Sequence, residues 1–278
     1  MGKMDAYQIV TAQIIEALES GVIPWRKPWH CVSLPTNLHT GKAYRGINLL
    51  TLSFSPYASP YWVTFKQSQA LGGSVKKGEK GRSIVFWSRM IKEDAETGEN
   101  KPVFLLKRYT VFNAEQCSGL DLPENKVERQ PDIEAAEKIH LFMPNRPRVS
   151  FDGSAAYYVP SRDQVVVPPK SAFHTMEGFY STLYHELVHS TGHASRLNRF
   201  KDDGSAHFGN ESYSKEELVA ELGAAFLCAH AGISNETQEN SAAYIQGWLR
   251  ALNNDKRMIM QAASAAQKAA DYILNVRD

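Results

Sequence analysis

One short motif limits the fold and chemistry of this chain more than any other segment, the run His185-Glu186-Leu187-Val188-His189. In a helix, residues four apart lie on one face one turn apart, so two imidazoles can bind one metal ion. Glu186 lies beside the first histidine, where a carboxylate can take a proton from a water that the metal activates. The surrounding residues 175–192 show a helical pattern. The sequence therefore predicts a metal-binding helix typical of a metal-dependent hydrolase.

A hydrolytic metal site of this kind needs a third protein ligand and leaves one position open for water. Glu217 and Glu221 lie four residues apart in a predicted helix, so Glu217 can bind the metal while Glu221 hydrogen-bonds a ligand histidine. Two alternatives stay open. Ser214 and Glu217 also fit a capping box, which would leave Glu221 as the third ligand. His193 is a further candidate, although it follows the expected end of its helix.

Composition limits the class of protein. The chain has 278 residues, of which 43% are hydrophobic and 22% charged, so we expect a folded core and room for two domains. The net charge of +1 gives no global argument for nucleic acid. Three scattered cysteines without a CxxC motif fit a reducing compartment. No apolar run approaches the ~20 residues of a membrane span, and no secretory signal is recognisable, so we expect a cytoplasmic protein.

The pattern of the chain predicts an α+β protein with two domains. Residues 1–125 are expected to form an α+β domain, and 126–278 a mostly helical domain with a small sheet. A polar composition break at 118–131 reads as the linker. The expected helices cover 4–20, 61–71, 132–143, 175–192, 214–231, 241–252 and 255–276, and the expected strands cover 82–91, 103–112, 155–159 and 163–168. The last of these strands would lie at the edge of its sheet, where it could hold an extended peptide.

Basic and aromatic residues alternate in the first domain. Lysine and arginine neutralise phosphates, and aromatic rings stack on unpaired bases without a sequence requirement. Any single one of these residues is more readily explained as part of a core or a solvated loop, but together they favour single-stranded DNA binding. The candidate DNA-binding residues are Trp25, Arg26, Lys27, Arg45, Asn48, Lys76, Lys77, Lys80, Arg82 and Trp87.

Several separated segments resemble the ArdC-type antirestriction proteins of conjugative plasmids and phages. They are residues 24–29, 44–48, the loop 76–82 with Phe86-Trp87, 111–113, 184–193 and 216–224. The resemblance implies an N-terminal single-stranded-DNA-binding domain, a C-terminal zincin-like metallopeptidase domain, and protection of incoming mobile DNA from host restriction in a bacterial cytoplasm. Related gluzincin-like peptidases use HExxH plus a Glu that an acid or amide follows four residues later. That pattern favours Glu217 as the third ligand.

Two functional hypotheses follow. In the first, one divalent metal, zinc or else an ion such as manganese, is held by His185, His189 and Glu217, and Glu186 serves as the base in peptide hydrolysis. In the second, the chain protects DNA by binding it, and the metal site is structural or relict. The intact Glu186 favours the first. A metallonuclease is disfavoured, because such enzymes use carboxylate-rich sites with two metals. The expected partners are single-stranded DNA and a protein substrate, and the sequence does not predict the oligomeric state.

Overall fold

The computed structural model describes residues 5–26, 34–53, 55–93, 100–123, 132–200, 211–235 and 242–276. Lys27, one of the candidate DNA-binding residues, lies outside them. The expected fold class is confirmed: an N-terminal α+β part is joined to a mostly helical C-terminal part with a small sheet. The predicted boundary between residues 125 and 126 falls outside the described residues and stays a prediction.

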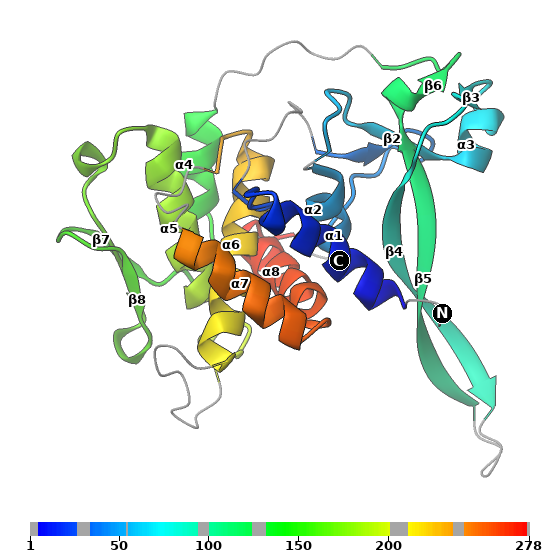
Figure 1. Cartoon of the computed structure of the whole chain (residues 1–278). Helices are drawn as coiled ribbons and strands as arrows, with labels where there is room; N and C mark the ends of the chain where they lie inside the picture. The colour runs from blue at the N-terminus through cyan, green and yellow to red at the C-terminus, as the bar shows by residue number, and fades with distance from the viewer. Residues whose placement is uncertain are drawn as a thin grey trace.

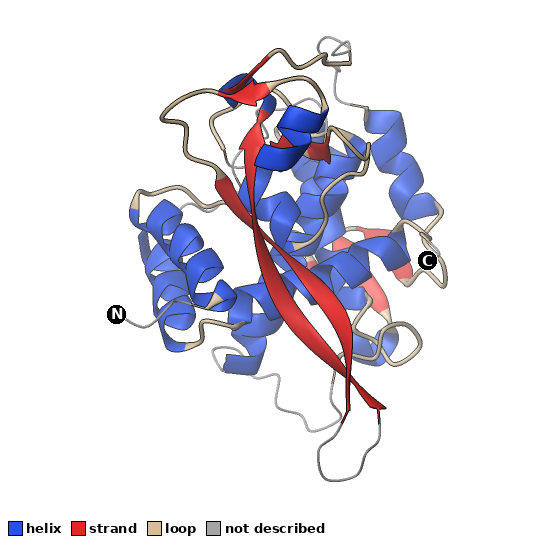
Figure 2. Ribbon diagram, turned by 90° about the vertical axis from the view of Figure 1, so that its right-hand side faces the viewer, coloured by secondary structure: helices blue, strands red, loops and turns tan. Residues whose placement is uncertain are grey.

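A long β-hairpin dominates the N-terminal part. Strands β4 (Arg82–Glu93) and β5 (Asn100–Asn113) pair antiparallel along their whole length, and Figure 2 shows them crossing in front of the helices. Both strands had been predicted from their β-branched and aromatic residues. They belong to a sheet with strand order β1-β2-β5-β4, in which β4 is an edge strand and β5 also pairs with β2. The remaining elements of this part are α1 (Ala6–Glu19), β1 (Thr36–Asn37), α2 (Ile47–Ser53), β2 (Tyr61–Thr64), α3 (Phe65–Ala70), β3 (Ser74–Val75) and β6 (Cys117–Ser118).

The helix predicted over 61–71 is half wrong. Its first residues form β2, which pairs with β5, and α3 begins only after Thr64. Thr64 caps α3, because its side chain accepts a hydrogen bond from the backbone of Gln67 while the Gln67 side chain binds back. The β-branched residues before this cap therefore end a strand rather than begin a helix.

Five helices and a three-stranded sheet make up the described C-terminal part. The helices are α4 (Ile133–Leu141), α5 (Met176–Ser190), α6 (Glu211–Ala231), α7 (Ala242–Asn254) and α8 (Met258–Ile273), and the strands are β7 (Arg148–Phe151), β8 (Tyr157–Val159) and β9 (Gln164–Val167). All five helices were predicted, but β7 was not. Strand β9 lies between β7 and β8, so its predicted place at the sheet edge is wrong. The edge next to α5 is β8.

One hydrophobic core joins the two parts. Val10, Ile14 and Leu18 of α1 are buried in the same cluster as Leu187 of α5 and Leu252 of α7. Figure 1 shows α1 lying along α7 in front of the other C-terminal helices. A second, smaller cluster lies under the hairpin. Because the first helix is built into the C-terminal part, the N-terminal segment helps to position that part. Among the described residues, no helix has the length and apolar character needed to cross a membrane.

Candidate functional site

Helices α5 and α6 bring three metal-binding side chains together. His185 and His189 project from α5, and their Nε2 atoms lie 3.1 Å apart. Glu217 faces them from α6, with one carboxylate oxygen 3.5 Å from Nε2 of His185 and the other 3.5 Å from Nε2 of His189. In the described part of the chain these residues form a group in which all the ligand atoms lie within 4.8 Å of one another.

These distances fit a single tetrahedral ion. Ligand atoms about 2.0–2.1 Å from such an ion are separated by about 3.3 Å. The two imidazole nitrogens lie 3.1 Å apart, and each has one of the two Glu217 oxygens 3.5 Å away, close to that value. Two nitrogens and one carboxylate are a donor set that zinc accepts and that also suits manganese, cobalt or nickel. The capping-box alternative for Glu217 is wrong, because α6 begins at Glu211 and Ser214 lies inside it. His193 instead bonds through Nδ1 to the Ser195 hydroxyl.

Glu186 lies beside this group in a buried position. Only 7% of the residue is exposed, and burial raises the pKa of its carboxyl group. It also accepts a hydrogen bond from the backbone of Tyr158 in β8. A carboxylate that is held in place and has a raised pKa is suited to accept and pass on a proton. The edge strand of the sheet therefore lies directly beside the candidate base.

Two residues that were not predicted, Glu216 and Arg199, orient His189. Nδ1 of His189 lies 3.4 Å from Oε1 of Glu216, and Glu216 accepts hydrogen bonds from Arg199 at 2.7 and 3.3 Å. The hydrogen bond from His189 and the Arg199 guanidinium outweigh burial and hold the pKa of Glu216 below its usual range. A carboxylate behind a ligand histidine fixes the ring and its tautomer. The sequence did contain a signal for this role, the adjacent acids Glu216 and Glu217. On a helix one of two neighbouring acids can bind the metal, while the other contacts a different side of the same histidine.

The prediction that Glu221 hydrogen-bonds a ligand histidine is wrong. Glu221 accepts a hydrogen bond at 2.5 Å from Arg26 and one at 2.9 Å from the Tyr244 hydroxyl, and it acts on His185 through its charge alone. The Arg26 guanidinium also stacks over the Tyr244 ring at 4.0 Å. With its side chain only 9% exposed, Arg26 is a structural partner of α6 and is withdrawn from the surface that DNA could reach.

A glycine sets the spacing of the two site helices. A Cβ atom at Gly223 of α6 would lie 2.7 Å from a methyl group of Val188 in α5, closer than side chains tolerate. Val188 immediately precedes His189, and Gly223 lies less than two turns after Glu217. The close approach that only glycine permits at this position therefore holds the carboxylate within reach of the imidazoles.

The proton on His185 competes with a metal ion. Burial disfavours a charged imidazole, but the hydrogen bond with Glu217 and the charge of Glu186 outweigh it and raise the pKa of His185 to about 9. Metal binding must release this proton at any pH below that value. We expect the apparent metal affinity to fall by about tenfold for each pH unit as the pH decreases from 9. Titration calorimetry in buffers of different ionisation enthalpy measures the released proton, and an affinity that is constant with pH would contradict the assignment.

Two of the candidate DNA-binding residues are buried. Trp25 is fully buried and packs edge-on against Trp248, so it has no face on which a base could stack. Asn48 is 6% exposed, and its side-chain amide bonds to both the N–H and the C=O of Val85 at the open edge of β4. Asn48 thus takes the place of a neighbouring strand. The interpretation of Trp25 as a direct DNA contact is therefore wrong, and the Asn48 amide is occupied by β4.

The remaining candidates lie in two places. Lys76, Lys77 and Lys80 are exposed on the loop that precedes β4, where Lys76 also bonds to the Glu115 carbonyl at 2.9 Å. Arg82 is half-buried, and burial lowers its pKa. The second place lies against α8 and contains Arg45 and Trp87.

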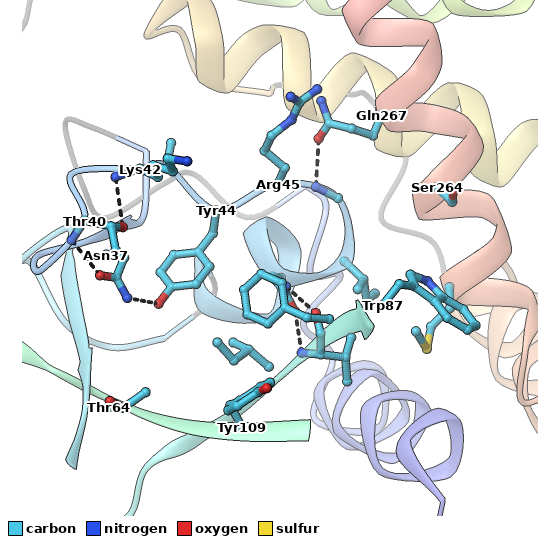
Figure 3. A pocket seen from close by; sticks show the side chains of 18 of the residues that line it. Asn37, Thr40, Lys42, Tyr44, Arg45, Thr64, Trp87, Tyr109, Ser264 and Gln267 are labelled. Atoms are coloured by element: carbon cyan, nitrogen blue, oxygen red, sulfur yellow. Dashed lines mark hydrogen bonds between the residues drawn. The ribbon is translucent and has the colours of Figure 1, made fainter. Parts of the chain in front are cut away.

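Trp87 and Arg45 line a cavity of about 750 Å³ (Figure 3). Trp87 is 58% exposed, and Arg45 forms an ion pair with Asp271 of α8. The cavity lies between the N-terminal elements α2, β4 and β5 on one side and α8 on the other. Of the ten candidates, Arg45, Asn48 and Trp87 therefore line one concave surface, and the Asn48 side chain is held there by Val85.

Comparison with known proteins decides the family. The N-terminal domain of anti-restriction factor ArdC, as a family model, matches residues 4–112, and a zincin-like metallopeptidase model matches 135–265. The crystal structure of the antirestriction protein ArdC from plasmid R388, in metal-free form, is 42% identical, with a TM-score of 0.79 over 97% of both chains. The chain belongs to the ArdC antirestriction family. The manganese(II)-bound crystal structure of ArdC from plasmid R388 gives a TM-score of 0.78 at 40% identity over 98% of both chains.

Two curated relatives extend this similarity. The protein y4eC of Sinorhizobium fredii, whose function is uncharacterized, is 39% identical over 97% of this chain and 91% of its own length. The DNA primase TraC of Escherichia coli is 37% identical over 98% of this chain. The match covers only 27% of TraC, so an ArdC-like unit forms one part of that larger protein.

Proposed function

We propose that this ArdC-family chain binds single-stranded DNA and hydrolyses peptide bonds at a one-metal site, and that it thereby protects incoming mobile-element DNA from restriction in the bacterial cytoplasm. The observation that carries the peptidase proposal is the convergence of His185, His189 and Glu217 with Glu186 beside them. The relative from plasmid R388 has a manganese(II)-bound structure, which supports binding of a divalent ion by this chain, and we propose zinc at the three ligands.

The roles of the residues follow from their positions. His185, His189 and Glu217 would hold the ion, which supplies Lewis-acid polarisation of a peptide carbonyl and makes a water more acidic. Glu186 takes the proton of the attacking water and delivers it to the leaving amine. The Tyr158 backbone orients the Glu186 carboxylate, and Glu216 orients the His189 ring.

Strand β8 is the proposed peptide-binding element. It pairs with β9 on one side only, and its backbone at Tyr158 faces Glu186. An extended peptide can add to such an edge through main-chain hydrogen bonds, which would place its scissile bond beside the base. In this proposal β8 holds the extended peptide, a role that was predicted for residues 163–168.

Metal removal tests the peptidase proposal. The protein is incubated with an unfolded reporter such as casein, before and after dialysis against a chelator. We expect cleavage that the chelator abolishes and that zinc or manganese restores, because the three ligand side chains cannot activate water without an ion. Cleavage that persists after the metal content has fallen to background would overturn the proposal.

The exposed loop lysines make the DNA proposal testable. Replacing Lys76, Lys77 and Lys80 together by Ala should weaken binding to a labelled oligodeoxythymidine and reduce the dependence of log affinity on log salt concentration by about two units, since each phosphate contact on a single strand contributes about 0.7. Fluorescence anisotropy at several salt concentrations measures the slope. An unchanged slope would remove this loop from the DNA interface.

A further inference from the structure

The cavity that contains Trp87 and Arg45 has walls from both halves of the chain. Elements α2, β4 and β5 form one wall, and α8 forms the other with Met260, Ser264, Gln267 and Lys268. Figure 3 shows Trp87 reaching toward α8, with Ser264 and Gln267 on that helix facing the N-terminal elements. We call this cavity the interdomain groove. Its volume of about 750 Å³ lies within the range of sites that take small ligands.

The two walls are held together by direct bonds. The backbone N–H of Gly46 donates to Oε1 of Gln267 at 2.7 Å, and Arg45 forms an ion pair with Asp271, which also accepts a hydrogen bond from Gln267. The groove is therefore a formed feature between α2 and α8. A molecule that enters it meets both domains at once.

Exposed aromatic rings line the wall from the hairpin. Trp87 is 58% exposed, Phe86 47% and Tyr109 44%, although residues of this size are usually buried in a folded protein. Phe86 and Tyr109 meet edge to face, with ring centroids 5.9 Å apart. Such surfaces mark a binding site for a planar or apolar group.

Cations lie beside these rings. The exposed side chains of Lys42 and Lys268 lie on opposite walls of the groove. The Asn37 amide bonds to Thr40, Tyr44 and Gln67 and so fixes the shape of one end of the groove. Flat π-faces next to positive charges are the combination that binds single-stranded nucleotides, with the bases stacked and the phosphates neutralised.

The groove continues past Trp87. A second cavity of about 600 Å³ shares Trp87, Met260, Ser264 and Lys268 with the first and extends to Tyr7 and Arg199. Two adjoining cavities with one tryptophan in common suit consecutive units of a chain better than an isolated small molecule. A polymer of stacked, negatively charged units fits both.

We infer that the interdomain groove binds unpaired nucleotides of a single DNA strand, and that α8 of the peptidase-like half is part of this binding site. This inference rests on the proposed single-stranded DNA binding and adds its location. Trp87 stacks on bases, and Lys268 pairs with a phosphate from the opposite wall. Bases in a duplex are paired and enclosed, so the groove selects single strands.

Two variants of α8 test the inference. Ser264→Tyr places a ring in the groove and should lower the affinity for a labelled oligodeoxythymidine by at least about tenfold. Lys268→Gln should weaken binding and lower the salt slope by about 0.7 units, the contribution of one phosphate contact on a single strand. Lys138→Gln on α4 is the matched control, because it removes the same charge from an exposed lysine whose partner is Glu134, outside the groove. Thermal melts establish that each variant folds.

The outcomes separate the inference from the proposed function. If the wild type binds oligodeoxythymidine while both α8 variants match it in affinity and slope, the groove is not the site, although the protein still binds DNA. If the wild type binds no single-stranded DNA, the proposed function fails and the inference with it. Photo-crosslinking of a 4-thiothymidine oligonucleotide to the wild type gives a second measurement. Crosslinks within α8 and β4 support the site, and crosslinks confined to other segments overturn it.

Discussion

Replacing Glu186 with Gln should lower metal-dependent peptide hydrolysis by about 10²–10⁴-fold, the range by which a positioned general base accelerates such reactions. Gln has the same shape and can keep a hydrogen bond to the edge strand, but it cannot accept the proton of the attacking water. The metal ligands are untouched, so bound metal should remain near one ion per chain. The affinity for oligodeoxythymidine should also remain unchanged, because the interdomain groove lies against α8 rather than α5.

The matched control for this variant lies on the same helix. Glu177 stands in the first turn of α5, far along the helix from the histidines, and Glu177→Gln removes the same charge. It should retain full hydrolysis. Hydrolysis by Glu186→Gln at the wild-type rate would end the assignment of Glu186 as base. A further readout, survival of transferred DNA in a restricting host, divides the two hypotheses of the sequence analysis. Full protection by a variant without hydrolysis would show that proteolysis is dispensable.

The metal-binding helix was predictable because its determinants are local. The period of its apolar residues, the spacing of its histidines and the neighbouring carboxylate all lie within α5, and the structure has that helix at Met176–Ser190. The same holds for α6, which carries Glu217. What the sequence did not reveal is how these helices are held, since the contacts of Arg199 with Glu216 and of Val188 with Gly223 depend on tertiary packing.

Burial of aromatic residues was the main source of error. Trp25 and Trp87 both stand beside basic residues, and composition treats them alike. Trp25 is 0% exposed, because it is part of the main core and packs against Trp248 of α7, while Trp87 is 58% exposed beside the groove. In the same way Arg26 has the charge of a phosphate-binding residue, but its guanidinium is paired with the carboxylate of Glu221, 195 positions later. No local pattern contains that pairing.

Short elements were missed for a related reason. Strand β7 has four residues and gains its stability from parallel pairing with β9, and the seven residues of α2 are all buried against other elements. Periodicity over such lengths is too weak to predict an element. The groove could not be predicted either, because one wall comes from the hairpin and the other from the last helix.

Replacing Glu217 with Gln is expected to lower metal affinity by more than about 100-fold, beyond the 10–100-fold that loss of a residue behind a ligand typically causes. The amide keeps the size of the side chain but removes the negative charge that neutralises a divalent ion. One Glu217 oxygen lies 3.5 Å from Nε2 of His185, and the other lies 3.5 Å from Nε2 of His189. These two nitrogens face the proposed ion. Competition with a chromogenic chelator measures the affinity.

The neighbouring residue provides a matched comparison that tests the ligand set itself. Glu216 lies 3.4 Å from Nδ1 of His189, on the side of the ring away from the proposed ion, so Glu216→Gln should weaken metal binding by only about 10–100-fold. The two losses of metal affinity can be compared directly, because both variants remove one charge from the same turn of α6. If Glu216→Gln had the larger effect, the ion would bind on the Nδ1 side of His189. The group formed by His185, His189 and Glu217 would then not be the metal site, and Glu186 would lose its place as the base beside it.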